Sequence, residues 1–255
     1  MKLYIDRLWT KRHGLFFLPV LVLLVLFNTG SLMRYVGQFM VTVFHEFGHA
    51  AVSWLLGYPA IPTFNVDGGI TIQMHRSLIV SIIIFALLAF VLVRAYRMES
   101  RFFTTLILCA VYTVVFTQTG LCQGLIVFMG HGGEMLCGLI FCYLGLHAYS
   151  GRKKAEKFVY TVMGLHIALN VILFARSLLS DGSELERYIN PSTGMTNDFV
   201  VLSDLSGKSI GFFAVLLIFS FIISAIALFF LLAKKRHIMA SHKNNYDEDE
   251  DLENV

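Results

Sequence analysis

The 255-residue chain is strongly apolar, with 56% hydrophobic and 15% charged residues and a mean hydropathy of +0.70. This composition excludes an ordinary soluble globular domain and indicates an integral membrane protein. The formal net charge of +3 combines basic loops with an acidic tail. It therefore gives no indication of a nucleic-acid partner.

Seven apolar runs are long enough, or nearly so, to cross a lipid bilayer, which takes about 20 residues per helix. They are residues 15–32, 35–56, 78–93, 102–116, 121–149 around a polar interruption, 158–179 and 210–233. We therefore predict an all-α polytopic membrane protein with six or seven transmembrane helices. Residues 1–236 are expected to form a single transmembrane domain.

The first apolar run follows four basic residues, Lys2, Arg7, Lys11 and Arg12. This is the outline of a signal peptide, but no small-residue cleavage site follows the run. We therefore expect an uncleaved first helix.

Basic residues also cluster at 94–101, 152–157 and 234–236. Two predicted helices separate each cluster from the next, so all three should lie on one face, the cytoplasmic one by the positive-inside rule. Seven spans put the amino terminus on the opposite face, although its own charges favour the cytoplasm, and we expect the loop clusters to prevail. Residues 237–255, an acidic run, are predicted to form a disordered cytoplasmic tail.

The second apolar run contains the sequence His45-Glu46-Phe47-Gly48-His49. On a helix, positions i and i+4 share a face, so His45 and His49 can bind one metal ion while Glu46 lies beside them. Two histidine ligands and a glutamate general base form the arrangement of zinc metalloproteases. Ionisable groups in a membrane helix are costly and usually functional, which favours this interpretation over two buried structural histidines.

Catalytic zinc usually has three protein ligands, so a third ligand must come from another segment. Asp181, at the end of an apolar helix, is our first choice. His131 and Glu134 lie three residues apart inside another apolar run, as ligands or as residues that support a ligand would. Asp198 lies in a polar loop rich in turn-forming residues and is the remaining alternative.

Two further features border the expected site. Asn170 lies four residues after His166 on one face of the sixth apolar helix, where the pair would line a cavity or join two helices. Residues 61–73 combine turn residues with alternating β-branched residues, which predicts a short β-hairpin.

The motif Phe44-His45-Glu46-Phe47-Gly48-His49-Ala50, together with Gly57 and Gly68-Gly69, resembles the site-2 protease family of intramembrane zinc metalloproteases, in particular its divergent bacterial branch. The resemblance resumes more loosely at Asn170, Leu179-Ser180-Asp181-Gly182, Leu185 and Pro191. The family's aspartate element has an Asn, Pro, Leu-Asp-Gly context, whereas here Asn170 and Asp181 are eleven residues apart without an intervening proline. This departure keeps the alternative third ligands open.

The resemblance implies that His45, His49 and Asp181 bind Zn²⁺, that Glu46 activates water and that Asn170 helps to hold substrate. It also implies a multi-pass protein of the bacterial inner membrane that cleaves membrane-embedded or membrane-proximal peptide segments in regulated proteolysis. Two other functions fit the same motif. One is a metal-dependent membrane hydrolase of another class, such as a lipid amidase, and the other is a non-enzymatic transporter or receptor that binds metal.

Overall fold

The computed structural model describes residues 11–29, 31–65, 68–98, 101–146, 154–191 and 196–230. Within these ranges the chain is mostly helical and forms one small two-stranded sheet. The elements in chain order are α2 (Lys11–Thr29), α3 (Ser31–Leu55), β1 (Ala60–Asn65), β2 (Gly68–Gln73), α4 (Leu78–Tyr96), α5 (Phe102–Thr117), α6 (Thr119–Leu146), α7 (Lys154–Ser180), α8 (Gly182–Ile189), α9 (Asp198–Ser206) and a last helix, Ile210–Phe230. The predicted tail, 237–255, lies outside the described residues.

Four of the described helices are long and apolar enough to cross a membrane: Leu78–Tyr96, Gly120–Leu146, Ala155–Ser180 and Ile210–Phe230. α5 is apolar but shorter, at 16 residues. α3 carries several polar side chains along its 25 residues. The chain is thus consistent with a helical membrane protein, but the predicted six or seven spans are not confirmed.

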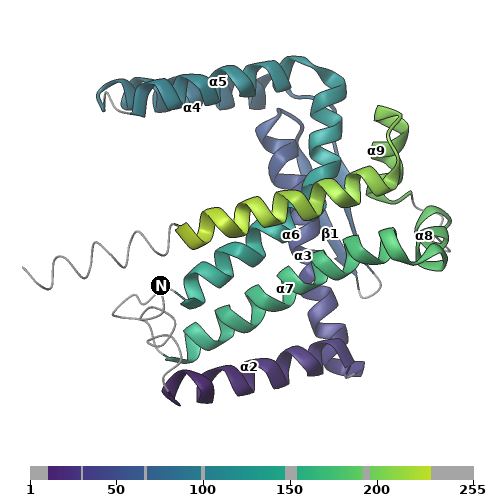
Figure 1. The fold of residues 1–255 in the computed structure, drawn as a ribbon. Coiled ribbons are helices and arrows are strands. Elements are labelled where there is room, and N and C mark those ends of the chain that lie inside the picture. The colour runs from purple at the N-terminus through teal and green to yellow at the C-terminus, as the bar shows by residue number, and fades with distance from the viewer. Residues whose placement is uncertain are drawn as a thin grey trace, which may run out of the picture.

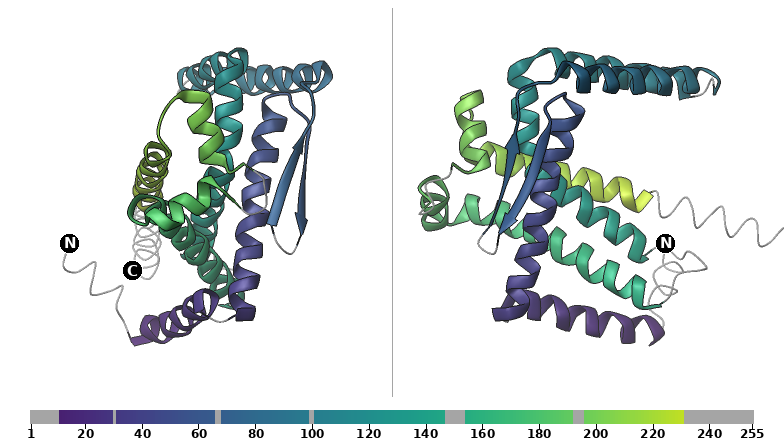
Figure 2. Two further views of the ribbon diagram at one scale, coloured as in Figure 1. Left: turned by 90° about the vertical axis from the view of Figure 1, so that its right-hand side faces the viewer. Right: turned by 180° about the vertical axis from the view of Figure 1, so that it is seen from behind.

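α3 lies across α2, α7 and the last helix instead of alongside them (Figures 1 and 2). It joins the end of α2 to the β-hairpin, so the start of α2, the α4–α5 connection, the start of α7 and the end of the last helix all lie at one end of the molecule. Residues 1–10 lie outside the described residues, so the expectation that the amino terminus lies opposite the basic loops stays a prediction.

The crossing of α3 and α6 is unusually close because both helices have glycine at the contact. A Cβ atom at Gly48 would lie 2.0 Å from the carbonyl oxygen of Met129, and one at Gly133 would lie 2.6 Å from the Cα atom of Gly48. Small residues let helix backbones approach in this way. The contact brings the middle of α6, which also changes direction along its length (Figure 1), against the His-Glu motif.

The predicted β-hairpin at 61–73 is confirmed as an antiparallel pair, β1 and β2, with Ile61 opposite Ile72 and Thr63 opposite Ile70. α3 ends before Gly57, whose φ of +85° is a conformation that favours glycine. The turn sends the chain back along α3, and the hairpin lies beside that helix (Figure 2). One strand of the hairpin thereby reaches the motif.

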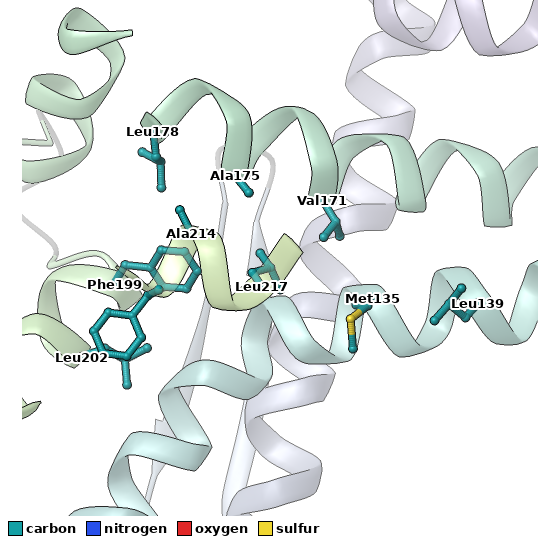
Figure 3. Close-up of a cluster of buried hydrophobic side chains, with 10 residues drawn as sticks. Met135, Leu139, Val171, Ala175, Leu178, Phe199, Leu202, Ala214 and Leu217 are labelled. Carbon is teal, nitrogen blue, oxygen red and sulfur yellow. The ribbon is translucent and has the colours of Figure 1, made fainter. Parts of the chain in front are cut away.

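The main hydrophobic core joins α6, α7, α9 and the last helix (Figure 3). Its buried members are Met135, Leu139, Val171, Ala175, Leu178, Phe199, Leu202, Phe213, Ala214 and Leu217. Phe199 is the largest of the fully buried side chains. The core therefore fixes the first turn of α9 against α6 and α7, next to the motif on α3.

Candidate metal centre

His45 and His49 lie on one face of α3, as their spacing predicts. Their Nε2 atoms are 3.0 Å apart, and the two rings meet edge to face. Both side chains border a cavity of about 800 Å³. The helix therefore directs two imidazole nitrogens to one point inside a cavity.

Asp198 brings a carboxylate to the same point. Its Oδ2 atom lies 3.0 Å from Nε2 of His45 and 3.2 Å from Nε2 of His49. The position is set by its neighbours: the Asn197 side chain donates to the carbonyl oxygen of Tyr188 at 2.6 Å, and Phe199 is anchored in the hydrophobic core. Three potential ligand atoms from α3 and α9 thus converge.

The second nitrogen of each histidine already has an acceptor. Nδ1 of His45 lies 2.6 Å from Oε1 of Glu134, and Nδ1 of His49 lies 2.8 Å from the carbonyl oxygen of Ile126. A ring that donates through Nδ1–H keeps its Nε2 lone pair free, which is the state that a metal ligand needs. Both contacts therefore orient the Nε2 atoms as ligands.

The three atoms fit a divalent metal ion such as zinc. Ligands at about 2.0–2.2 Å from zinc in a tetrahedral arrangement are about 3.3–3.6 Å apart, a few tenths of an ångström more than the 3.0–3.2 Å separations found here. Among the described residues Oδ2 of Asp198 is buried without a hydrogen-bond partner, and a buried carboxylate oxygen in that state is costly unless an ion balances it. These observations favour a metal site.

Gly130 on α6 keeps the space beside these atoms open. A Cβ atom there would lie 2.4 Å from Nε2 of His49 and 2.6 Å from Nε2 of His45. Any side chain at this position would enter the space that an ion bound by the two nitrogens would occupy. Glycine at position 130 therefore leaves room for an ion beside the two nitrogens, apart from the glycine contact at Gly133.

The charge of Asp198 reflects the same contacts. Burial raises the pKa of its carboxyl group, but the imidazoles of His45 and His49 lower it by more, so that the pKa lies well below its usual range. The group is therefore ionised at neutral pH. An ionised carboxylate is the form that binds zinc.

Glu46 lines the same cavity and is held by the hairpin. The Thr71 hydroxyl on β2 lies 2.7 Å from Oε2 of Glu46 and 3.0 Å from its backbone carbonyl oxygen. Gly69 packs against the glutamate stem, because a Cβ atom there would be 2.5 Å from Cγ of Glu46. The side chain is 5% exposed and has a defined position beside the histidine pair.

His131 and Glu134 form a second possible group with His45. Here, however, Oε1 of Glu134 approaches Nδ1 of His45 to 2.6 Å, a hydrogen-bond distance that is too short for two ligands of one zinc ion. Nδ1 of His131 lies 3.2 Å from the same oxygen. The geometry favours a supporting role for this pair over direct ligation.

Asp181, our first choice for the third ligand, lies in neither group of possible ligands among the described residues. It is exposed and caps α8, accepting hydrogen bonds from the backbone and hydroxyl of Ser183 and from the backbone N–H of Glu184. The Ser183 hydroxyl and these N–H groups lower the pKa of the Asp181 carboxyl group. The structure brings Asp198 to the histidines in its place.

Asn170, predicted to position substrate, does border the cavity. Its side chain accepts a hydrogen bond of 2.9 Å from Nε2 of Gln38 on α3 and donates to the backbone oxygen of His166. Asn170 and Gln38 therefore join α7 to α3 at the cavity wall. His166 is buried beneath them, with its ring 5.0 Å from that of Phe27.

Several residues of the site were missed at the sequence level: Gln38, Thr71, Ile126 and Tyr188. Thr71 belongs to the predicted hairpin, so it was near a recognised feature. A backbone carbonyl such as that of Ile126 carries no sequence signal.

Searches for related proteins found no matching family model, no matching curated protein and no matching solved structure.

Proposed function

We propose that this protein is a zinc-dependent intramembrane endopeptidase, a multi-pass membrane protein that cleaves peptide segments within or next to the bilayer. The observation that carries the proposal is the convergence of His45, His49 and Asp198 at separations of 3.0–3.2 Å, with both Nδ1 atoms already hydrogen-bonded. The buried Oδ2 atom of Asp198, which has no hydrogen-bond partner among the described residues, supports the proposal. The resemblance to site-2 proteases is consistent with this assignment.

His45, His49 and Asp198 would hold the zinc ion, which supplies Lewis acidity and an activated water. Glu134 and the Ile126 carbonyl oxygen keep the two rings in the ligating orientation. The set of two nitrogens and one carboxylate oxygen leaves a coordination position free, as catalytic zinc sites do.

Glu46 would act as the general base and then as the proton donor to the leaving amine. It lies directly after His45 on α3 and borders the same cavity. Thr71 holds one carboxylate oxygen through its hydroxyl at 2.7 Å, which restricts the orientation of the other. A fixed carboxylate close to the reaction site is what efficient proton transfer requires.

The polar wall of the cavity favours a peptide as substrate. Besides the charged cluster it carries hydroxyl and amide side chains from three elements: Gln38 and Thr42 on α3, Thr71 and Gln73 on β2, and Asn170 on α7. Uncharged donors and acceptors of this kind can pair with the N–H and C=O groups of a peptide that has unwound from a helix. Acyl chains would leave these groups without partners.

The experiment uses the full chain in detergent micelles, loaded with zinc and incubated with fluorogenic peptides that each carry an apolar segment long enough to span a bilayer. The wild type should cleave at least one peptide in a chelator-sensitive manner. Glu46→Gln should retain its zinc and lose cleavage, whereas His45→Ala should lose both. Glu156→Gln, an exposed site at the start of α7, is the matched control and should behave like wild type.

Cleavage by Glu46→Gln at the wild-type rate would contradict the mechanism. Hydrolysis of phospholipids or acyl amides without cleavage of any peptide would instead identify a lipid-directed hydrolase. Zinc binding without hydrolysis of either class would favour a non-enzymatic metal-binding protein.

A further inference from the structure

Glu134 on α6 orients the His45 ring in the proposed metal site, and it is buried together with His131, for which that site gives no role. Glu134 is 4% exposed and His131 is 8% exposed, in an apolar helix. Buried ionisable groups are costly unless they are paired, so the placement of both at one point needs an explanation. They lie three residues apart and therefore share a face of the helix.

Glu134 contacts two histidines through one oxygen. Oε1 lies 2.6 Å from Nδ1 of His45 and 3.2 Å from Nδ1 of His131. The first is a short hydrogen bond, and the second is a close polar contact outside hydrogen-bond geometry. The carboxylate thus links the ligand on α3 to a histidine on α6.

The ring of His131 is fixed in turn by aromatic side chains from two other helices. It stacks on Phe174 of α7, with the ring centroids 4.2 Å apart, and meets the edge of Phe199 of α9 at 5.0 Å. Phe199 directly follows Asp198 in the sequence. His131 therefore lies between the segment that carries the carboxylate ligand and the glutamate that holds a histidine ligand.

We propose that Glu134 is a positioning residue for the metal site and that His131 holds Glu134 in place, so that the pair couples His45 on α3 to Asp198 on α9. The proposal rests on the metal site given under the proposed function. A carboxylate that accepts the Nδ1–H proton of a ligating histidine fixes the ring and increases its basicity. Loss of such a partner typically costs about 10–100-fold in metal affinity.

The test measures zinc affinity, so it needs no substrate. The full chain in detergent is stripped of metal, and the Kd for Zn²⁺ is determined by competition with a chromophoric chelator. Glu134→Gln keeps the size of the side chain and removes its charge. We expect one zinc per chain and a Kd raised about 10–100-fold. Glu156→Gln, the same change at an exposed position, should leave the Kd unchanged.

A second pair of variants tests the link to His131 and remains informative if Glu134→Gln does not fold. Asn can place an amide donor near the position of Nδ1, whereas Leu offers none. His131→Asn should therefore keep most of the zinc affinity, and His131→Leu should lose part of it, with a smaller change than Glu134→Gln. A role in packing alone predicts the opposite order, because Leu suits the apolar contacts with Phe174 and Phe199 better.

An unchanged Kd in Glu134→Gln would overturn the proposal, because a residue that only packs tolerates this isosteric change. Complete loss of zinc at saturating concentrations would also overturn it, by making Glu134 a ligand. Failure of the wild type to bind zinc would instead contradict the proposed function, so the two failures can be told apart.

Discussion

The middle of α3 and the α4–α5 pair are both helical and rich in apolar residues, but their surroundings differ. α4 is apolar on all sides, and large side chains such as Leu78 and Phe90 are 75% and 67% exposed. α3 instead turns His45, Glu46 and His49 toward α6, α9 and the hairpin. Uniform hydrophobicity therefore marks a surface suited to lipid, whereas polar residues within an apolar helix mark the candidate metal centre.

The largest expected effect concerns packing at the centre. Phe199→Ala removes a fully buried ring next to Asp198 and should lower the free energy of unfolding by about 3–5 kcal/mol. Phe90→Ala, the same change on exposed α4, should alter it by less than about 0.5 kcal/mol. Chemical denaturation in micelles measures both values. Equal effects would mean that α4 is as closely packed in the protein as the centre.

The next effect concerns space at the metal site. Gly130→Ala places a methyl group 2.4 Å from Nε2 of His49 and 2.6 Å from Nε2 of His45, the proposed zinc ligands, so zinc affinity should fall by about 100-fold. Gly120 lies at the start of α6, where a Cβ atom would have no atom within 4 Å. Gly120→Ala should therefore leave the zinc affinity unchanged. Chelator competition compares the two. Wild-type affinity in Gly130→Ala would place the zinc ion elsewhere.

A smaller effect should follow from loss of the contact between the hairpin and Glu46. Thr71→Val removes the hydroxyl at nearly constant volume, so kcat for peptide cleavage should fall by about 10-fold while zinc content stays constant. Thr71→Ser should restore most of the rate. Thr63→Val is the control, since the Thr63 hydroxyl donates to Ile70 within the hairpin and not to the site. A wild-type kcat in Thr71→Val would contradict a role for the Thr71 hydroxyl in orienting Glu46.

The sequence predicts the local features of this molecule well and its long-range contacts poorly. The helical character, the hairpin and the shared face of His45 and His49 depend on residue spacing alone, and all three are present. The crosswise course of α3 depends on tertiary contacts such as Gly48 against Gly133, and the helix pattern does not encode it.

The choice between Asp181 and Asp198 as the proposed third ligand also depends on long-range contacts. Asp181 and Asp198 both lie in polar segments after α7, and each begins a short helix or caps one. The two aspartates differ in the residue that follows. Asp198 precedes Phe199, which is buried in the core, whereas Asp181 caps the exposed helix α8. An aspartate that precedes a large aromatic residue is a weak sequence signal for a buried ligand. The position of Asp198 beside the histidines depends on the packing of α9 against α6, which the sequence does not reveal.

The most direct test of the metal site compares these two aspartates. Purified wild-type protein, Asp198→Ala and Asp181→Ala are analysed for bound zinc after equilibration with a limiting chelator. We expect one zinc per chain in the wild type and in Asp181→Ala, and an empty site in Asp198→Ala. Full zinc occupancy in Asp198→Ala together with loss of zinc in Asp181→Ala would contradict the assignment.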